Sequence, residues 1–375
     1  MENLNLAELQ RYSRHLILPG FGLKGQKKLK SSSVLVVGAG GLGSPVLLYL
    51  AAAGVGHIGI VEYDLVDATN LQRQILYNDK ETGQPKGALA AQKLEALNPA
   101  IKTTWHDTFL NSNNALEIIR PYDIVIDGSD NFPTRYLVND ACVLLDKPLI
   151  YGAIFRFEGQ VSVFNALTDD GKRGPNYRDL YPSPPPPGMV PSCAEGGVLG
   201  VLPGIIGSMQ ANEAIKVLTG IGEPLTGRMF IIDTATFETR TLKFKARNDY
   251  KIHQLIDYEQ FCNSASNKPE LPHITPKAFN DIPGSDRPKY ALVDVREPFE
   301  HDISDIGGIK IPLDQLEKRL SELPKENTLV LYCRSGKRSA NAQQILHDKG
   351  FKNTLNLIGG INRWASEVDP SIKTY

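Results

Sequence analysis

A short β-branched run that enters a glycine-rich turn constrains the fold of this chain more than any other feature. Ser33 to Val37 leads into Gly38-Ala39-Gly40-Gly41-Leu42-Gly43, and Ser44 to Ala53 then follows a helical pattern. Glycines let the backbone approach a ligand closely and leave the start of the helix facing a phosphate group. We therefore expect a nucleotide-binding strand–turn–helix unit. The glycines expected at the phosphates are Gly38, Gly40, Gly41 and Gly43.

A second strand-like run, His57 to Val61, ends at an acidic residue. Glu62 stands about twenty residues after the glycine turn, the interval at which a carboxylate binds ribose hydroxyls in dinucleotide-binding folds. A nicotinamide-dependent oxidoreductase would share both features. This alternative therefore stays open at this point.

Charged and amide side chains downstream favour a triphosphate over a dinucleotide. Cations neutralise the phosphates and the leaving pyrophosphate, and a carboxylate can hold Mg²⁺. The two phosphates of a dinucleotide need no such cluster. The residues are Asp64, Asn70, Arg73, Gln74, Lys86, Asp130 and Asn131. Upstream, Arg14 lies on a helix-like segment that can supply a further arginine, from a partner subunit.

These motifs resemble the MoeB/ThiF family, the prokaryotic E1-like enzymes that adenylate the C-terminal glycine of ubiquitin-fold sulfur carriers. The resemblance runs from Arg11-Tyr12-Ser13-Arg14 to near Arg247, and includes Asn70-Leu71-Gln72-Arg73-Gln74, Gly83-Gln84-Pro85-Lys86, Ser129-Asp130-Asn131, Glu158-Gly159-Gln160 and Gly204-Ile205-Ile206-Gly207-Ser208. It implies a Rossmann-like α/β domain and an ATP site lined by Gly41, Glu62, Asn70, Arg73, Lys86, Asp130 and Asn131. It also implies that Asp130 binds Mg²⁺ and that Arg14 reaches the ATP of a neighbouring subunit in a homodimer. Glu62 stands where relatives often carry aspartate.

One departure from that family concerns zinc. Many relatives hold a zinc ion with two CxxC pairs, but the first pair reads Asn176-Tyr177-Arg178-Asp179 here, and no pair occurs near Arg247 to Tyr250. A structural zinc site needs four good donors. We therefore expect no structural zinc.

A proline-rich segment, Gly171 to Pro191, is expected to form a long surface loop. Cys193 follows it, in the region that the resemblance assigns to a crossover near the adenylate. Cys193 can there receive the activated acyl group or a persulfide. The alternative is an inert small apolar residue, because no cation is close to it in sequence.

A basic loop in the last quarter of the chain carries the second set of candidate groups. Cys333-Arg334-Ser335-Gly336-Lys337-Arg338-Ser339 lies between a strand-like run, Thr328 to Tyr332, and a helix-like run, Ser339 to Lys349. Backbone N–H groups and three cations stabilise a thiolate, which can carry a persulfide. A half-buried cysteine in a solvated turn is the plain alternative.

This half resembles the single rhodanese domain in its Asp294-Val295-Arg296-Glu297, Cys333 and Gly359-Gly360-Ile361-Asn362-Arg363-Trp364 segments. Asp294 and Arg296 are expected to hold the architecture. The Cys333 loop is also similar to phosphatase loops, but the fused carrier-activating domain favours sulfur. The whole arrangement looks like the MoeZ type of adenylyltransferase/sulfurtransferase.

Length and composition set the remaining expectations. The 375 residues suggest two domains, here residues 1–247 (adenylyltransferase) and 273–375 (rhodanese), with a linker at 248–272. A formal charge of −1 gives no electrostatic case for nucleic acid. We expect no membrane span and no signal peptide, and hence a cytoplasmic protein. The widely spaced Cys142, Cys193, Cys262 and Cys333 argue against a disulfide framework.

The predicted function is ATP- and Mg²⁺-dependent adenylation of a Gly-Gly-terminated ubiquitin-like carrier, followed by sulfur transfer from Cys333 to form a thiocarboxylate. The catalytic candidates are Cys333, Cys193, Arg14, Arg73, Lys86 and Asp130. Thiosulfate or a cysteine desulfurase is the expected sulfur donor. Molybdopterin biosynthesis is the preferred pathway, with thiamine, cysteine or tRNA thiolation carriers as alternatives. A non-catalytic scaffold for carrier and desulfurase and a nicotinamide-dependent oxidoreductase are the rival classes.

Overall fold

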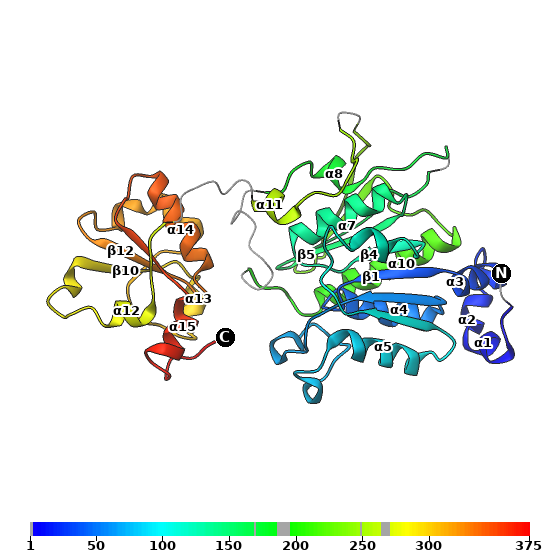
Figure 1. Cartoon of the computed structure of the whole chain (residues 1–375), viewed down its shortest axis with the longest axis horizontal. Coiled ribbons are helices and arrows are strands. Elements are labelled where there is room, and N and C mark those ends of the chain that lie inside the picture. Colours follow the sequence, from blue (N-terminus) through cyan, green and yellow to red (C-terminus); the bar gives the residue numbers. More distant parts are fainter. Residues whose placement is uncertain (1–2, 169, 186–195, 248–249, 264–270) are drawn as a thin grey trace. The chain divides into compact units, whose positions relative to one another are not determined.

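The computed structural model describes residues 3–168, 170–185, 196–247, 250–263 and 271–375. The described residues up to 263 form one compact unit, and residues 271–375 form a second. Both units are drawn in Figure 1, the first in blue to yellow-green and the second in yellow to red. The first unit continues through the helix that ends at residue 263, so part of the segment expected to be a linker packs with it.

A mixed sheet forms the centre of the first unit. Its order is β3-β2-β1-β4-β5-β6-β7-β8, parallel from β3 to β5 and antiparallel from β5 to β8. The strands are β1 (Ser33–Val37), β2 (His57–Val61), β3 (Lys102–His106), β4 (Ile124–Asp127), β5 (Leu149–Phe155), β6 (Glu158–Phe164), β7 (Arg228–Asp233) and β8 (Thr239–Lys243).

Helices cover both faces of the parallel part of this sheet, with α4 and α5 on one side and α7 on the other (Figure 1). The α-helices are α1 (Leu6–Arg11), α2 (Ser13–Leu16), α3 (Gly22–Lys30), α4 (Gly43–Ala53), α5 (Lys86–Leu97), α6 (Ala115–Ile119), α7 (Phe132–Leu144), α8 (Tyr177–Leu180), α10 (Leu202–Thr219) and α11 (Tyr258–Asn263). Two short 3-10 helices are η1 (Ala68–Asn70) and η2 (Asp79–Glu81).

The alternation of side chains along β1 explains why this strand is apolar throughout. Val34 and Val36 belong to the core that includes residues of α4 and α5. Leu35 and Val37 belong to the opposite core, with residues of α6 and α7. Successive side chains of a strand point to opposite faces, so a strand covered on both faces reads as a continuous hydrophobic run.

The second unit is built on a parallel sheet with the order β11-β10-β12-β13-β9. Its strands are β9 (His273–Ile274), β10 (Tyr290–Asp294), β11 (Ile309–Lys310), β12 (Thr328–Tyr332) and β13 (Thr354–Leu357). Its helices are α12 (Pro276–Asn280), α13 (Pro298–His301), α14 (Lys337–Asp348) and α15 (Gly360–Glu367), with the 3-10 helices η4 (Arg287–Lys289), η5 (Leu313–Lys318) and η6 (Leu320–Glu322).

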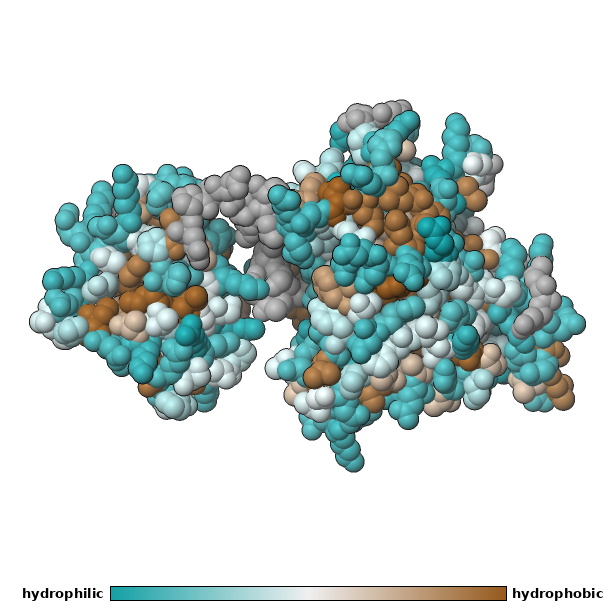
Figure 2. Space-filling model, viewed as in Figure 1, coloured by the Kyte–Doolittle hydropathy of each residue, from teal (hydrophilic) through white to brown (hydrophobic). Residues whose placement is uncertain are grey.

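The predicted α/β class is confirmed, as are the strands at residues 33–37, 57–61 and 328–332. β10 ends at Asp294 and α13 starts at Pro298, so Val295, Arg296 and Glu297 lie in the connection between them. Within the described ranges, every helix is too short or too polar to cross a bilayer. In the view of Figure 2, hydrophilic side chains cover much of both units and apolar ones reach the surface in separate patches.

Candidate active sites

The turn from β1 into α4 has the geometry that its glycines predict. Gly38 has a left-handed φ of 92°. A Cβ at Gly43 would lie 2.0 Å from the carbonyl oxygen of Gly38, and one at Gly38 would lie 3.0 Å from that of Gly128. Only glycine allows this close approach of the turns after β1 and β4. Two loops from neighbouring parallel strands therefore meet at one edge of the sheet, where such folds bind ligands.

Glu62 is buried against the glycine turn. Its Oε2 accepts a hydrogen bond from the Ala39 N–H at 2.9 Å, and its Oε1 accepts from the N–H groups of Tyr63 and Asp64, each at 2.9 Å. Backbone donors hold the carboxylate at the end of β2. The residue predicted from its interval after the turn thus lies beside that turn.

Amide and cationic side chains after η1 face the glycines. A Cβ on Gly40 would lie 3.4 Å from Nε2 of Gln74, and one on Gly41 would lie 3.5 Å from Cγ of Arg73. Gln74 Nε2 donates to Oδ1 of Asn70 at 2.7 Å, and Arg73 Nη1 donates to the carbonyl of Thr69 at 3.3 Å. The structure therefore places Arg73 and Gln74 beside the turn and Asn70 next to Gln74.

Lys86 is a buried cation at the start of α5. Its side chain is 4% exposed, and Nζ lies 3.3 Å from Oδ2 of Asp64, whose side chain is 56% exposed. The backbone N–H of Lys86 donates to the carbonyl of Asp64 at 2.9 Å. Tyr77 connects this helix start to the glycine turn, because its hydroxyl lies 3.0 Å from the Ala39 carbonyl and 3.3 Å from the Lys86 carbonyl. A buried ammonium with an exposed carboxylate partner suits an anionic ligand.

The loop after β4 presents Asp130 at the surface. Asn131 caps α7 by accepting from the Thr134 N–H at 2.9 Å. Asp130 is exposed. Burial raises the pKa of Tyr63, and the negative charges of Asp64, Glu62 and Asp130 raise it further. The three carboxylates thus act on one tyrosine at this edge. Mg²⁺ is typically held by one or two carboxylates together with substrate phosphates, so Asp130 fits that role.

The sequence did not point to two charged residues behind this loop, the fully buried Asp127 and the largely buried Arg135. Oδ1 of Asp127 accepts from the N–H and the hydroxyl of Ser129, at 2.9 and 2.5 Å. Arg135 donates to the Ser129 carbonyl at 3.3 Å, and its Nε lies 3.5 Å from Oδ2 of Asp127. Burial raises the pKa of Asp127 despite the nearby Arg135. The signal was a carboxylate ending an apolar strand, eight residues before an arginine in the next helix.

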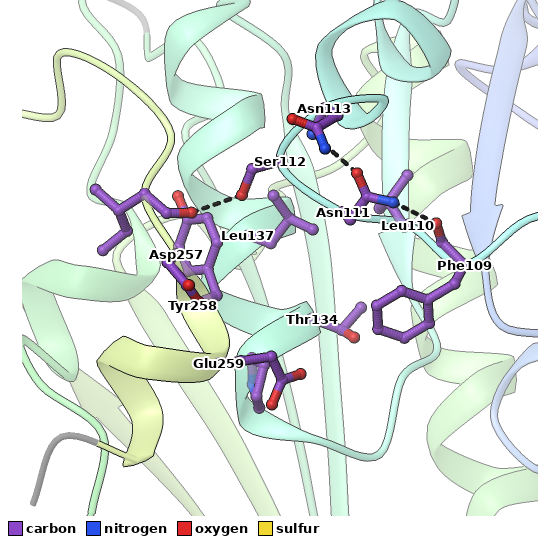
Figure 3. Close-up of a pocket in the computed structure, with 12 residues that line it drawn as sticks. Phe109, Leu110, Asn111, Ser112, Asn113, Thr134, Leu137, Asp257, Tyr258 and Glu259 are labelled. Atoms are coloured by element: carbon purple, nitrogen blue, oxygen red, sulfur yellow. Dashed lines mark hydrogen bonds between the residues drawn. The ribbon is translucent and has the colours of Figure 1, made fainter.

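A cavity of about 380 Å³ opens beside the start of α7 (Figure 3). The loop after β3 forms one wall, with Phe109 in edge contact with Tyr63 at 5.5 Å between ring centroids. Residues 256–259 at the start of α11 form another wall, joined to that loop by a 2.5 Å hydrogen bond from the Ser112 hydroxyl to the Ile256 carbonyl. Glu259 and Thr134 border the same space in Figure 3.

Polar contacts occupy the positions that the resemblance assigns to zinc ligands. Oδ2 of Asp179 accepts from the Asn176 N–H at 2.7 Å, and Oδ1 accepts from the Arg247 N–H at 2.7 Å. Tyr250 donates its hydroxyl to Oδ1 of Asn176 at 3.0 Å. Over the residues that the structure describes, no cluster of three or more histidine, cysteine or carboxylate side chains could hold a metal ion. Hydrogen bonds therefore join the segments around Asn176, Asp179 and Tyr250.

Arg14 and three of the four cysteines remain to be placed. Arg14 is exposed on α2, which packs on α3. Cys193 falls outside the described residues. Cys142 is buried in α7, and burial raises the pKa of its thiol. Cys262, expected in the linker, is instead buried where α11 packs on α7.

The second candidate site surrounds Cys333, at the end of β12. Its Sγ accepts from the Gly336 N–H at 3.2 Å, and the Ser339 hydroxyl lies 3.5 Å away. Gly336 has a φ of 91° and directly precedes α14. The thiol is 1% exposed. The loop therefore places a backbone N–H and a serine hydroxyl beside the sulfur.

A second glycine turn, Gly359-Gly360, packs against the Cys333 loop. The N–H of Ile361 donates to the Cys333 carbonyl at 2.9 Å, and the N–H of Asn362 donates to the Arg334 carbonyl at 3.1 Å. A Cβ on Gly360 would lie 2.2 Å from the Cys333 oxygen. The Gly359-Gly360 pair is thus required by the close contact between the turns that start α14 and α15.

The loop cations have unequal surroundings. Arg338 donates two hydrogen bonds of 2.6 Å to Glu300. Burial alone would raise the pKa of Glu300, but hydrogen bonds from Arg338, Tyr375 and the backbone of Glu297 lower it to about 2. The guanidinium of Arg334 lies 5.5 Å from the ring centroid of Tyr375. Glu300 and Tyr375 were not singled out in the sequence, because neither lies near Cys333 along the chain.

Asp294 and Arg296 hold the architecture, as predicted. Both side chains are fully buried, and Nη2 of Arg296 lies 2.7 Å from Oδ2 of Asp294. Arg296 also donates to the Ser304 carbonyl at 2.9 Å. This pair fixes the end of β10 next to the Cys333 loop.

Two family models match the chain in agreement with these units. The ThiF family model matches residues 12–252, and the rhodanese-like domain model matches residues 275–367. A probable adenylyltransferase/sulfurtransferase MoeZ of Mycobacterium tuberculosis is 49% identical over 99% of this chain and 96% of its own length. The adenylyltransferase and sulfurtransferase MOCS3-2 of Zea mays is 43% identical over 98% of this chain and 81% of its own.

Other similar proteins cover the first unit. A sulfur carrier protein adenylyltransferase of Thermus thermophilus is 55% identical over 68% of this chain and 97% of its own length. A crystal structure of E. coli MccB with ATP is 23% identical, with a TM-score of 0.55, and covers 66% of this chain and 75% of its own. At that identity the structural match shows the fold alone.

Proposed function

The chain belongs to the ThiF family and joins its ThiF domain to a rhodanese-like domain, and we propose that it adenylates a ubiquitin-like sulfur carrier and then transfers sulfur to it. Full-length relatives are named as adenylyltransferases and sulfurtransferases. The observation that carries this proposal is that one chain holds both a glycine turn with Arg73 beside it and a buried cysteine whose sulfur accepts from a backbone N–H.

In the first half-reaction, the carboxylate of the carrier's C-terminal glycine attacks the α-phosphate of ATP, and pyrophosphate leaves. Arg73 and Lys86 neutralise the phosphates, while the glycine turn allows their close approach. Glu62 faces the ribose. Asp130 would hold Mg²⁺, which supplies charge neutralisation at the phosphates. The acyl-adenylate that results has a carbonyl carbon activated for sulfur transfer.

In the second half-reaction, the Cys333 thiolate takes the sulfane sulfur of a donor. With thiosulfate, the new S–S bond forms as sulfite leaves with the electron pair of the old one. The terminal sulfur of the persulfide then attacks the acyl carbon, and AMP departs. Attack by the Cys193 thiolate on the acyl disulfide would release the thiocarboxylate and leave a Cys193–Cys333 disulfide, which a cellular thiol reduces.

The carrier and pathway extend this proposal. A carrier with a C-terminal Gly-Gly that serves molybdopterin synthesis is the preferred substrate, in keeping with the relatives named MoeZ and MOCS3. Carriers for thiamine, cysteine or tRNA thiolation are the alternatives. We place this chemistry in the cytoplasm, where free thiols persist.

A homodimer completes the proposal, with Arg14 reaching the partner's ATP. The segment around Arg14 exposes apolar side chains, with Leu6 and Ile17 each 72% exposed and Leu18 49% exposed. An apolar surface beside an exposed arginine suits burial against a second copy.

The test is intact mass spectrometry of Gly-Gly-terminated carriers after incubation with this protein, ATP, Mg²⁺ and thiosulfate. Replacement of one carrier oxygen by sulfur is expected, together with AMP release. AMP release without the mass gain would contradict the sulfur-transfer half. The absence of both with every carrier would contradict the whole proposal, and NADH binding in its place would favour an oxidoreductase.

A further inference from the structure

Tyr375 contacts one residue of the Cys333 loop and two residues that lie outside it. Its hydroxyl donates to Oε1 of Glu300 at 2.7 Å and accepts from Nη1 of Arg296 at 3.1 Å. Its ring centroid lies 5.5 Å from the Arg334 guanidinium. One side chain therefore connects a loop cation with two groups outside the loop.

The hydroxyl of Tyr375 is held by a rigid support. Arg296 is fully buried and is fixed in turn by Asp294 and the Ser304 carbonyl. Glu300 is buried and carries two short hydrogen bonds from Arg338. Because these partners are fixed, the two hydroxyl contacts set the position of the tyrosine ring.

The loop's two arginines differ in what they can offer to an anion. Arg338 has its charge compensated by a bidentate bond with Glu300. Among the described residues, the Arg334 guanidinium lies over the ring of Tyr375. A cation–π contact orients a guanidinium without using its N–H donors. Arg334 is thus oriented yet keeps hydrogen bonds for a ligand.

We propose that Tyr375 is a positioning residue of the sulfur-transfer site, which holds Arg334 in place to bind the oxyanion end of a small sulfur donor. This inference rests on the proposed sulfur transfer. The chemical class that fits is a sulfane sulfur attached to a sulfonate-like group, as in thiosulfate. The guanidinium N–H groups pair with its oxygens, while Cys333 takes the outer sulfur.

The two parts of Tyr375 can be separated by substitution. Tyr375→Phe keeps the ring at Arg334 and removes the hydroxyl, whereas Tyr375→Ala removes both. Thiosulfate:cyanide sulfurtransferase kinetics are measured for the full chain. We expect Tyr375→Ala to raise the KM for thiosulfate about fivefold with little change in kcat, and Tyr375→Phe to raise it less, about twofold. Lys373→Ala, which removes an exposed cation from the same segment, is the matched control and is expected to leave KM unchanged.

Arg334→Ala and the double variant Arg334→Ala/Tyr375→Ala test whether the tyrosine acts through the arginine. If it does, the double variant has the KM of Arg334→Ala alone. Additive effects, or an unchanged KM in a folded Tyr375→Ala, would overturn the inference. Should Tyr375→Ala not fold, Tyr375→Leu supplies the same comparison with the apolar volume kept. A wild-type protein without thiosulfate:cyanide activity would overturn this inference alone, because a cysteine desulfurase can still load Cys333 in the proposed function.

Discussion

The guanidinium of Arg178 donates two hydrogen bonds to the carboxylate of Asp140, from Nε to Oδ1 at 2.8 Å and from Nη2 to Oδ2 at 2.7 Å. The hydroxyl of Tyr258 donates to the same carboxylate at 2.7 Å, and the guanidinium lies 4.6 Å from the ring centroid of Phe261. Tyr258 and Phe261 belong to α11. The ion pair therefore joins α7 and α8 to α11.

Breaking this pair from one side is expected to destabilise the first unit. Arg178→Met leaves Asp140, 1% exposed, as an uncompensated buried carboxylate. We expect a loss of about 3 kcal/mol in the free energy of unfolding, measured by urea denaturation. The matched control is Lys172→Met at the exposed pair with Asp170, where the change should stay below about 0.5 kcal/mol. Equal effects of the two variants would contradict this account.

Metal removal should leave the first unit intact. Asn176, Asp179 and Tyr250 already bond to one another through oxygen and nitrogen atoms, and a structural zinc needs thiolate or imidazole donors. After treatment with a chelator and return of Mg²⁺, the melting temperature and the rate of AMP formation are expected to be unchanged. Elemental analysis that finds one zinc per chain in the untreated protein would refute the prediction.

Local signals made β1, its glycine turn and β12 predictable. A β-branched run followed by glycines restricts a strand and turn within some fifteen residues, and the periodicity of that stretch can be read directly. The same holds for the Cys333 loop, whose Gly336 N–H and Ser339 hydroxyl come within six residues of the cysteine along the chain.

Contacts that depend on topology could not be predicted in this way. Tyr258 lies 118 residues from Asp140, and Tyr375 lies 75 residues from Glu300. Tyrosine is common in cores and at surfaces alike, so its type says nothing of such a partner. The strand order and the packing of the helices decide which distant elements come into contact. Local periodicity in the sequence predicts neither of them. For that reason α11 was assigned to a linker.

The buried cation of the adenylation site gives a third prediction. Lys86→Met removes the buried ammonium next to Asp64 and keeps the length of the side chain, so ATP–pyrophosphate exchange is expected to fall about 100-fold. The exchange rate of Asp130→Asn should fall by a similar factor, and this variant should need a higher Mg²⁺ concentration. Lys80→Met, at an exposed lysine of η2, is the control and should exchange like the wild type. Wild-type exchange by Lys86→Met would remove this lysine from the proposed mechanism.

Acid should weaken the second unit through Glu300. Its pKa is about 2 in the folded protein, below the ordinary 4.5, so folding favours the carboxylate. The stability from this group is fully present above about pH 4.5 and is lost as the pH falls towards 2. We expect a loss on the order of 3 kcal/mol over that window.

The measurement is urea unfolding followed by Trp364 fluorescence in a Trp105→Phe background, because Trp105 and Trp364 are the two tryptophans of the chain. Glu300→Gln should be less stable than its parent at pH 7 and show a flatter dependence between pH 4.5 and 2. Parallel pH profiles for the two proteins would count against the role assigned to Glu300.

Cys333→Ala should separate the two half-reactions. Because the glycine turn, Arg73 and Lys86 belong to the first unit, AMP formation with a carrier is expected to continue, while thiocarboxylate formation falls below detection. Cys262→Ala, at a cysteine buried between α11 and α7, is the control and should retain both activities.

Cys193→Ala distinguishes the relay from direct release: if Cys193 resolves the acyl disulfide, mass spectrometry without added thiol should find the carrier joined to the enzyme through Cys333. Free thiocarboxylate from that variant would exclude Cys193 from the relay, and loss of AMP formation in Cys333→Ala would contradict the division of labour between the two sites.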